Sequence, residues 1–210
     1  MVTLTARLEK RDLGSAIGDV RKVLAATSLP VGYVYEIGGQ YESQQSSFRE
    51  LLFVLGLAMT AVFAVLVIQF RAFTPALVII SAAPLSVAGV FLLLIITGTP
   101  LNVSSFMGII LMVGLVVKNG IILFEYYERL RGTQSVAEAL VQAGRIRMRP
   151  ILMTTLCTLF GLLPLALGIG SGAELQKPLA IAVIGGLSLS MLVTLVIMPV
   201  LYASVRRQRA

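Results

Sequence analysis

The hydrophobic positions of this chain change character near residue 48. Before it, apolar residues alternate with polar ones in short runs, and after it they form long, nearly uninterrupted stretches. A helix of about 20 apolar residues is long enough to cross the roughly 30 Å hydrocarbon layer of a membrane. The pattern therefore predicts a mainly α-helical, polytopic membrane domain, residues 49–210, preceded by a small polar module, residues 1–48.

Five stretches after residue 48 have the length of a membrane span. Pro84, Pro164 and Pro199 lie inside them, and membrane helices tolerate such prolines as kinks. The connections after the first two stretches are only a few residues long, so we expect neighbouring helices to run antiparallel. The predicted transmembrane helices are approximately residues 51–70, 75–97, 103–124, 150–169 and 178–204.

The longest connection between predicted spans, residues 125–149, contains a helix signal of its own. Ser135 and Glu138 have the identities and spacing of a capping box, and apolar residues then recur on one helical face. We expect a short amphipathic helix, about residues 136–146, lying along the cytoplasmic membrane surface.

The polar module has a β-α-β pattern. Residues 2–8 and 31–37 alternate like half-buried strands, and the apolar residues between them, over 13–24, follow helical spacing. Two strands and one helix bury too little apolar surface to be stable alone. We therefore expect the module to pack against a protein segment outside this chain.

Composition and charge narrow the function. Of the 210 residues, 57% are hydrophobic and 13% are charged, which is too apolar for a soluble domain with a polar surface. The net charge is +7, but the basic residues are not interleaved with aromatic ones, so nucleic-acid binding is not expected. Nine Lys or Arg residues near the span ends fall on one side and Lys177 on the other, which predicts a cytoplasmic C-terminus and an N-terminus outside.

The chain lacks the side chains of the common catalytic centres. It has no His and a single cysteine, Cys157, so it cannot build a zinc or copper site of the usual ligand types by itself. It shows no nucleophile-base pair and no phosphate-binding glycine loop, so an enzyme is the weakest class. We expect no cofactor, and the remaining classes are a transporter and a membrane protein that only inserts and associates.

Lys118 lies inside the third predicted span, in the sequence GLVVKNGIILF. An ammonium group in hydrocarbon costs several kcal/mol, so Lys118 marks a functional path if it faces a protein interior. Its side chain can instead extend to the membrane interface, because the predicted span ends only six residues later. Asn119 is likewise typical of a functional site or of helix packing. These residues alone leave both interpretations open.

A second polar group lies in RIRMRPILMTTL, where Arg145, Arg147 and Arg149 precede Thr154. The arginines are equally typical of positive-inside anchors. Membrane threonines most often donate a hydrogen bond to a carbonyl of their own helix.

Several longer motifs resemble one known family. GIILMVGLVVKNGIILFEYYERL and RIRMRPILMTTLCTLFGLLPLALGIGSG resemble the tenth and eleventh membrane helices of resistance-nodulation-division exporters of the hydrophobe and amphiphile class. PLSVAGVFLLLIITGTPLNVSSFMG resembles their ninth helix, and MPVLYASVRR resembles the end of their twelfth. The likeness covers essentially the whole chain, with helices 8–12 matched by the five spans and a periplasmic pore subdomain matched by the polar module.

In that family a Lys on the tenth helix forms a proton relay with two Asp residues of the N-terminal half. The resemblance assigns Lys118 to the relay Lys, Asn119 to its neighbour, Arg147 to the relay-associated Arg and Thr154 to the relay Thr. Metal-exporting members usually carry an acidic residue on this helix where this chain has Lys118 and Asn119, so the resemblance favours organic substrates.

The resemblance implies the C-terminal part of a proton-driven exporter of hydrophobic or amphiphilic compounds in the bacterial inner membrane. Its implied partners are the N-terminal half of the permease, membrane lipid, a homotrimeric arrangement, a periplasmic adaptor and an outer-membrane channel. The acidic relay residues belong to the other half, so we expect this chain to be inactive alone. Two alternatives stay open, a truncated non-functional membrane remnant and part of a related exporter of metals or lipids.

Overall fold

The computed structural model describes residues 13–27, 35, 37, 40–132 and 134–207, and its regular structure over these residues is entirely helical. The helix expected in the polar module is present as α1, Leu13–Ala26. The two strands expected beside it lie outside the described residues, apart from Tyr35 and Ile37, which have no regular structure. The chain divides into two compact units, Met1–Glu50 and Leu51–Ala210.

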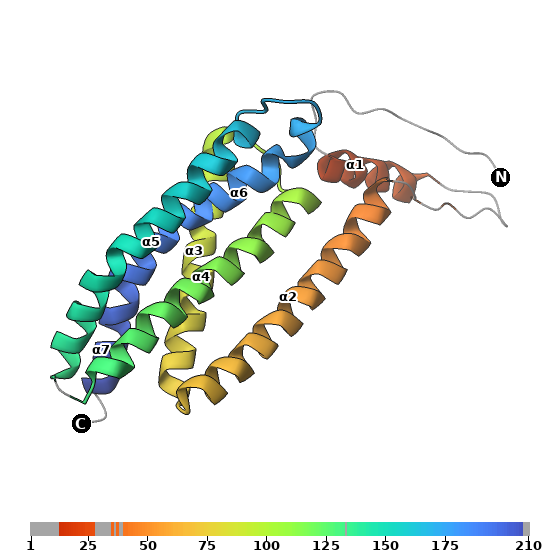
Figure 1. Cartoon of the computed structure of the whole chain (residues 1–210). Coiled ribbons are helices and arrows are strands. Elements are labelled where there is room, and N and C mark those ends of the chain that lie inside the picture. Colours follow the sequence, from red (N-terminus) through yellow and green to blue (C-terminus); the bar gives the residue numbers. More distant parts are fainter. Residues whose placement is uncertain (1–12, 28–34, 36, 38–39, 133, 208–210) are drawn as a thin grey trace. The chain divides into compact units, whose positions relative to one another are not determined.

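Five helices are long and apolar enough to cross a membrane, as the sequence predicts. The first four are α2 (Gln40–Phe70), α3 (Phe73–Thr97), α4 (Val103–Leu130) and α5 (Val136–Ala166). The fifth joins α6 (Ala173–Leu192), the π-helix η1 (Val193–Ile197) and α7 (Met198–Arg207) without a break (Figure 1). α2 begins at Gln40 rather than at residue 51, so its apolar stretch is the continuation of a polar helix.

Short connections between the spans have well-defined caps. α2 and α3 are joined by Arg71 and Ala72, and Arg71 takes up the left-handed conformation with φ 48°. Gly98 ends α3 with φ 62°, a conformation that glycine adopts without steric cost. Asn102 then starts α4, because its side chain accepts a hydrogen bond from the Ser105 amide while the Ser105 hydroxyl accepts one from the Asn102 amide.

α5 differs from the prediction. The short surface helix expected at 136–146 and the span expected at 150–169 form one helix of 31 residues, which begins at the predicted capping box of Ser135 and Glu138. Pro150 lies inside this helix and does not end it, although it lacks a backbone donor. The buried side chains on both sides of it, Ala143 before and Ile151 after, continue one stripe against neighbouring helices, so packing holds the two parts in line.

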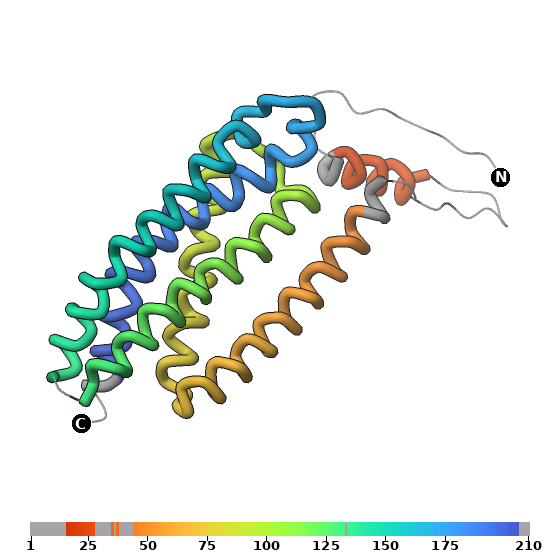
Figure 2. Tube along the Cα trace, viewed as in Figure 1, coloured from red at the N-terminus to blue at the C-terminus, as the bar shows by residue number. Residues whose placement is uncertain are grey.

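α6 is the central helix of the bundle and contacts α3, α4 and α5 (Figures 1 and 2). Glycines allow these helices to approach closely. A Cβ added to Gly108 of α4 would lie 2.8 Å from the Leu179 carbonyl oxygen of α6, and one added to Gly186 of α6 would overlap the Met112 side chain of α4. Such contacts matter in a membrane, where dispersion and close packing rather than the hydrophobic effect hold helices together.

The π-helix η1 lies just before a proline, although the prolines inside α3 and α5 stand in regular α-helix. Pro199 follows it, and a proline in a regular α-helix clashes with the carbonyl of the residue four positions earlier. The wider turn of η1 is visible in its hydrogen bonding, because the Met198 amide donates to the Val193 carbonyl, five residues back.

Candidate functional site

Lys118 is exposed and lies in the middle part of α4. The exposed positions of α4 before it, Met107, Leu111 and Gly114, recur every three or four residues and so form one helical stripe with it. Its immediate neighbours Val117 and Asn119 are buried. The described chain therefore presents a single ammonium group on a face of α4 that is apolar until the ion pair of Glu125 and Arg129 near the end of the helix.

Asn119 is directed away from this stripe. Only 8% of its surface is exposed, and successive helical residues are about 100° apart, so it lies on a different face from Lys118. The next residue, Gly120, lies in the helix interface, because a Cβ there would meet Met198 of α7 at 2.8 Å and Ile79 of α3 at 3.0 Å. The structure thus places Asn119 at the edge of the packed core.

Thr154 is exposed on α5, and its hydroxyl is bonded within its own helix. The Oγ1 donor lies 3.1 Å from the carbonyl oxygens of both Pro150 and Ile151. This is the arrangement typical of membrane threonines, and it leaves the hydroxyl oxygen able to accept a further hydrogen bond. The next residue, Thr155, is buried instead.

Arg147 is half-buried and joins α5 to α4. Its guanidinium carbon lies 5.1 Å from the centre of the Tyr126 ring, which is a cation–π contact. Its Nε atom is buried without a hydrogen-bond partner among the described residues. Tyr126 is eight residues beyond Lys118, about 12 Å along the helix, so Arg147 packs at a different level of α4 from Lys118.

Among the described residues, no hydrogen bond or ion pair joins Lys118, Asn119, Arg147 and Thr154 to one another. What they share is the pair of neighbouring helices α4 and α5. Two of them, Lys118 and Thr154, are exposed on the isolated chain and are open to contact with another protein segment.

A cluster of four aromatic rings was not anticipated from the sequence. Phe124 of α4 lies at its centre, with ring centroids 6.4 Å from Phe70 of α2, 6.1 Å from Tyr127 and 5.0 Å from Tyr202 of α7, all edge to face. Such pairs add to the apolar contact of the rings. In the sequence, only the spacing of Phe124 and Tyr127 on one helical face pointed to this cluster. The cluster joins the ends of three spans.

Comparison with known proteins places the chain among efflux transporters. Residues 1–206 match the AcrB/AcrD/AcrF family. The chain is 32% identical over 209 residues to "Cobalt-zinc-cadmium resistance protein CzcA" of Cupriavidus metallidurans, covering 99% of this chain and 20% of that protein. It is 36% identical over 204 residues to "Protein HelA" of Legionella pneumophila, covering 96% and 19%.

A solved structure agrees with these matches. The X-ray crystal structure of a heavy metal efflux pump, crystal form II, superposes with a TM-score of 0.84 at 33% identity and covers 95% of this chain and 20% of that one. The chain thus spans about a fifth of the length of the relatives it matches.

These relatives overturn one expectation. The hydrophobe and amphiphile class, with organic substrates, was wrong, because the similar proteins include a cobalt-zinc-cadmium resistance protein and the similar structures are two crystal forms of a heavy metal efflux pump. Lys118 and Asn119 had favoured organic substrates, but two positions on one membrane helix do not determine which substrate a pump binds at another site. The wider assignment holds, and because the match extends over residues 1–206, the chain belongs to the AcrB/AcrD/AcrF family of resistance-nodulation-division transporters.

Proposed function

We propose that this chain is the C-terminal transmembrane part of a proton-driven exporter of heavy-metal cations, and that Lys118 belongs to its proton relay. The substrate class is supported by the similarity to a cobalt-zinc-cadmium resistance protein and to the heavy metal efflux pump structure. Because the chain spans about a fifth of those proteins, transport is proposed for the complete pump.

The observation that carries the relay is the isolated cation on the exposed face of α4. Lipid is a poor neighbour for that ammonium group, whereas a carboxylate from another part of the pump can pair with it away from water. When a proton neutralises such a carboxylate, the attraction to Lys118 weakens and a different helix arrangement becomes stable. Alternation between the two arrangements couples inward proton movement to outward cation movement.

The other three residues have supporting roles in this proposal. Thr154 is exposed and its hydroxyl oxygen can still accept, which suits a hydrogen bond from a protonated relay carboxyl group or from a water on the proton path. Arg147 holds α5 against α4 through its contact with the Tyr126 ring. Asn119, at the edge of the core, fixes the rotation of α4 that presents Lys118 outward.

Cation recognition is assigned to other parts of the pump. Zinc and cadmium prefer thiolate and imidazole ligands, and this chain has no His and one Cys. We propose that the cation binds to the parts of the pump outside this chain. The proposed partners, which follow from the family resemblance, are the N-terminal half of the pump, a homotrimeric arrangement, a periplasmic adaptor and an outer-membrane channel. The proposed location is the bacterial inner membrane with the C-terminus in the cytoplasm, supported by the nine basic residues on that side.

A complete pump that contains this chain tests the proposal. Lys118→Ala should abolish Zn²⁺-dependent proton flux in proteoliposomes and remove resistance to Zn²⁺, Cd²⁺ and Co²⁺ in a host without related exporters. Lys118→Arg should also be impaired, because relay geometry is lost although the charge remains. Lys177→Ala, which removes a half-buried cation at the start of α6, is the matched control and should transport normally.

The two parts of the proposal fail separately. Normal proton-coupled transport by Lys118→Ala at wild-type expression removes Lys118 from the relay but leaves the substrate class intact. If the wild-type pump gives its host resistance to organic dyes but not to the three cations, the substrate class is overturned and the relay is left intact.

A further inference from the structure

The three arginines that lead into the membrane part of α5 do not share one face of the helix. Successive residues of an α-helix are about 100° apart, so Arg145 and Arg149 lie about 40° apart and Arg147 lies on the opposite side. The structure agrees with this geometry, because Arg147 is half-buried against Tyr126 whereas Arg145 and Arg149 are exposed. The continuous helix α5 thus separates one inward arginine from two outward ones.

The two outward arginines have no carboxylate partner among the described residues. The arginines at the end of α4 differ, since each holds a Glu of its own helix, Arg129 with Glu125 at 2.8 Å and Arg131 with Glu128 at 3.2 Å. The charge of Arg145 and Arg149 is therefore left for a group outside the described chain.

The acidic residue of α5 on this side is already engaged. Glu138 lies seven residues before Arg145, about 10 Å along the helix. Its carboxylate accepts hydrogen bonds from the Ser135 hydroxyl at 2.6 Å and from the Ser135 amide at 3.2 Å. Glu138 thus caps the helix and does not neutralise the arginines.

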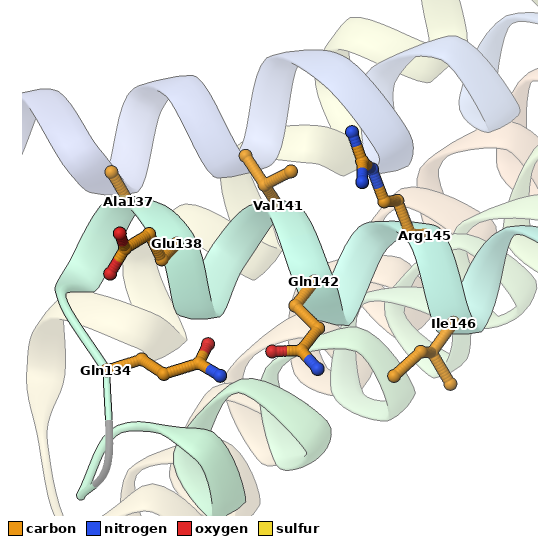
Figure 3. A pocket seen from close by; sticks show the side chains of 7 residues that line it. All are labelled: Gln134, Ala137, Glu138, Val141, Gln142, Arg145 and Ile146. Atoms are coloured by element: carbon orange, nitrogen blue, oxygen red, sulfur yellow. The ribbon is translucent and has the colours of Figure 1, made fainter.

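A shallow groove runs along the same outward side of α5 and ends at Arg145 and Ile146 (Figure 3). Figure 3 shows Gln134 and Glu138 at its far end and Gln142 between them and Arg145. Most of the surface that lines the groove is apolar, and the side-chain amides of Gln134 and Gln142 add groups that can donate or accept hydrogen bonds.

Beyond the arginines the same face becomes apolar. Met153, one turn after Arg149, is 68% exposed, and Leu156 and Phe160 continue the exposed side chains into the membrane part of α5. Along this face a groove that carries two amide side chains, two cations and an apolar strip follow one another. A phospholipid has the same order of headgroup, phosphate and acyl chains.

We propose that Arg145 and Arg149 together bind the phosphate of an anionic phospholipid of the cytoplasmic leaflet. The headgroup lies in the groove beside Gln142, and an acyl chain follows Met153 and Phe160. Guanidinium groups bind phosphate oxygens through paired hydrogen bonds, and the two arginines are only about 6 Å apart along the helix. Their uncompensated charge favours an anionic lipid over a zwitterionic one.

The chain has no Trp, which allows a direct test on the full 210-residue protein. Met153→Trp introduces a single fluorophore one turn from Arg149, in bilayers that contain either brominated phosphatidylglycerol or brominated phosphatidylcholine. Quenching should show at least about threefold stronger relative binding of phosphatidylglycerol. Adding Arg145→Gln and Arg149→Gln should reduce this ratio to about one, because the phosphate contacts are removed.

Two controls make the result specific. Arg129→Gln with Arg131→Gln removes the same charge from ion-paired positions and should leave the ratio unchanged. Ile95→Trp, a 79% exposed position near the opposite end of the bundle, should show no preference between the lipids in the wild-type background.

Three outcomes overturn the proposal. They are equal quenching by both lipids at Met153→Trp, a preference that survives the loss of Arg145 and Arg149, and a preference that is present in this chain but disappears in a complete pump. The last would show that another protein segment covers the arginines. Circular dichroism of each variant checks that the helices are intact.

Discussion

Gly89 of α3 and Gly185 of α6 meet backbone to backbone. A Cβ added to either residue would lie 2.5 Å from the carbonyl oxygen of the other. An approach this close admits no side chain, and it brings many backbone atoms of the two helices into contact. The pair therefore fixes how α3 and α6 cross.

Substitution of either glycine should destabilise the bundle. Gly89→Ala or Gly185→Ala forces the helices apart, and we expect a loss of about 1–3 kcal/mol in the free energy of unfolding. Gly56→Ala in α2 is the control, because nothing lies near its Cβ position and alanine favours a helix. The melting temperature of each variant is measured by thermal unfolding in detergent. Equal melting temperatures for Gly89→Ala and Gly56→Ala would show that the close contact of Gly89 and Gly185 does not stabilise the bundle.

The contact between Arg147 and Tyr126 should be measurable by a double-mutant cycle. Tyr126→Leu removes the aromatic face and should cost about 0.5–2 kcal/mol of stability, whereas Tyr126→Phe should cost much less. In an Arg147→Gln background the Tyr126→Leu change should have a smaller effect, because the cation is gone. Additive losses would show that the two side chains do not interact.

The orientation of the chain can be tested with cysteines. Cys157 is exposed, so it is first replaced by Ala. A cysteine introduced at Ser171, between α5 and α6, should react with a membrane-impermeant maleimide from the periplasmic side, and one at Ser204 in α7 should not. Labelling of the Ser204 position in intact spheroplasts would reverse the proposed topology.

Expression of this chain alone should give no resistance to Zn²⁺, Cd²⁺ or Co²⁺. The relay proposed for Lys118 needs a carboxylate from another part of the pump, and the chain spans about a fifth of its metal-exporting relatives. The minimal inhibitory concentration in an exporter-deficient host should equal that of the empty vector. Reproducible resistance from this chain would mean that the transport machinery is contained within it.

The sequence predicted the spans where local chemistry marks their ends. α3 ends at Thr97 and α4 begins at Val103, as expected, because Gly98 and Asn102 cap them. α5 was divided wrongly at Pro150, because a proline is a strong local signal for a helix start and the packing that holds both sides in line is not visible in the sequence.

The candidate site was predictable only in part. Lys118 stands out in the sequence because charge inside an apolar span is expensive. Its exposure, and the position of Arg147 about 12 Å further along α4, depend on how α4 and α5 pack. The roles of these residues remain predictions, and the proposed substrate class rests on the relatives rather than on Lys118 or Asn119.

The π-helix η1 sets the rotational phase of the end of the chain. A π turn contains one residue more than an α turn, so the residues after it are rotated by about 100° relative to an uninterrupted helix. With this offset Met198 lies against Gly120, and Tyr202 lies 5.2 Å from the Tyr127 ring. An unbroken α-helix would turn both side chains more than a quarter of a revolution away. The last span thus keeps buried side chains toward its neighbours both before and after η1, which a straight α-helix of constant period would not do with this sequence.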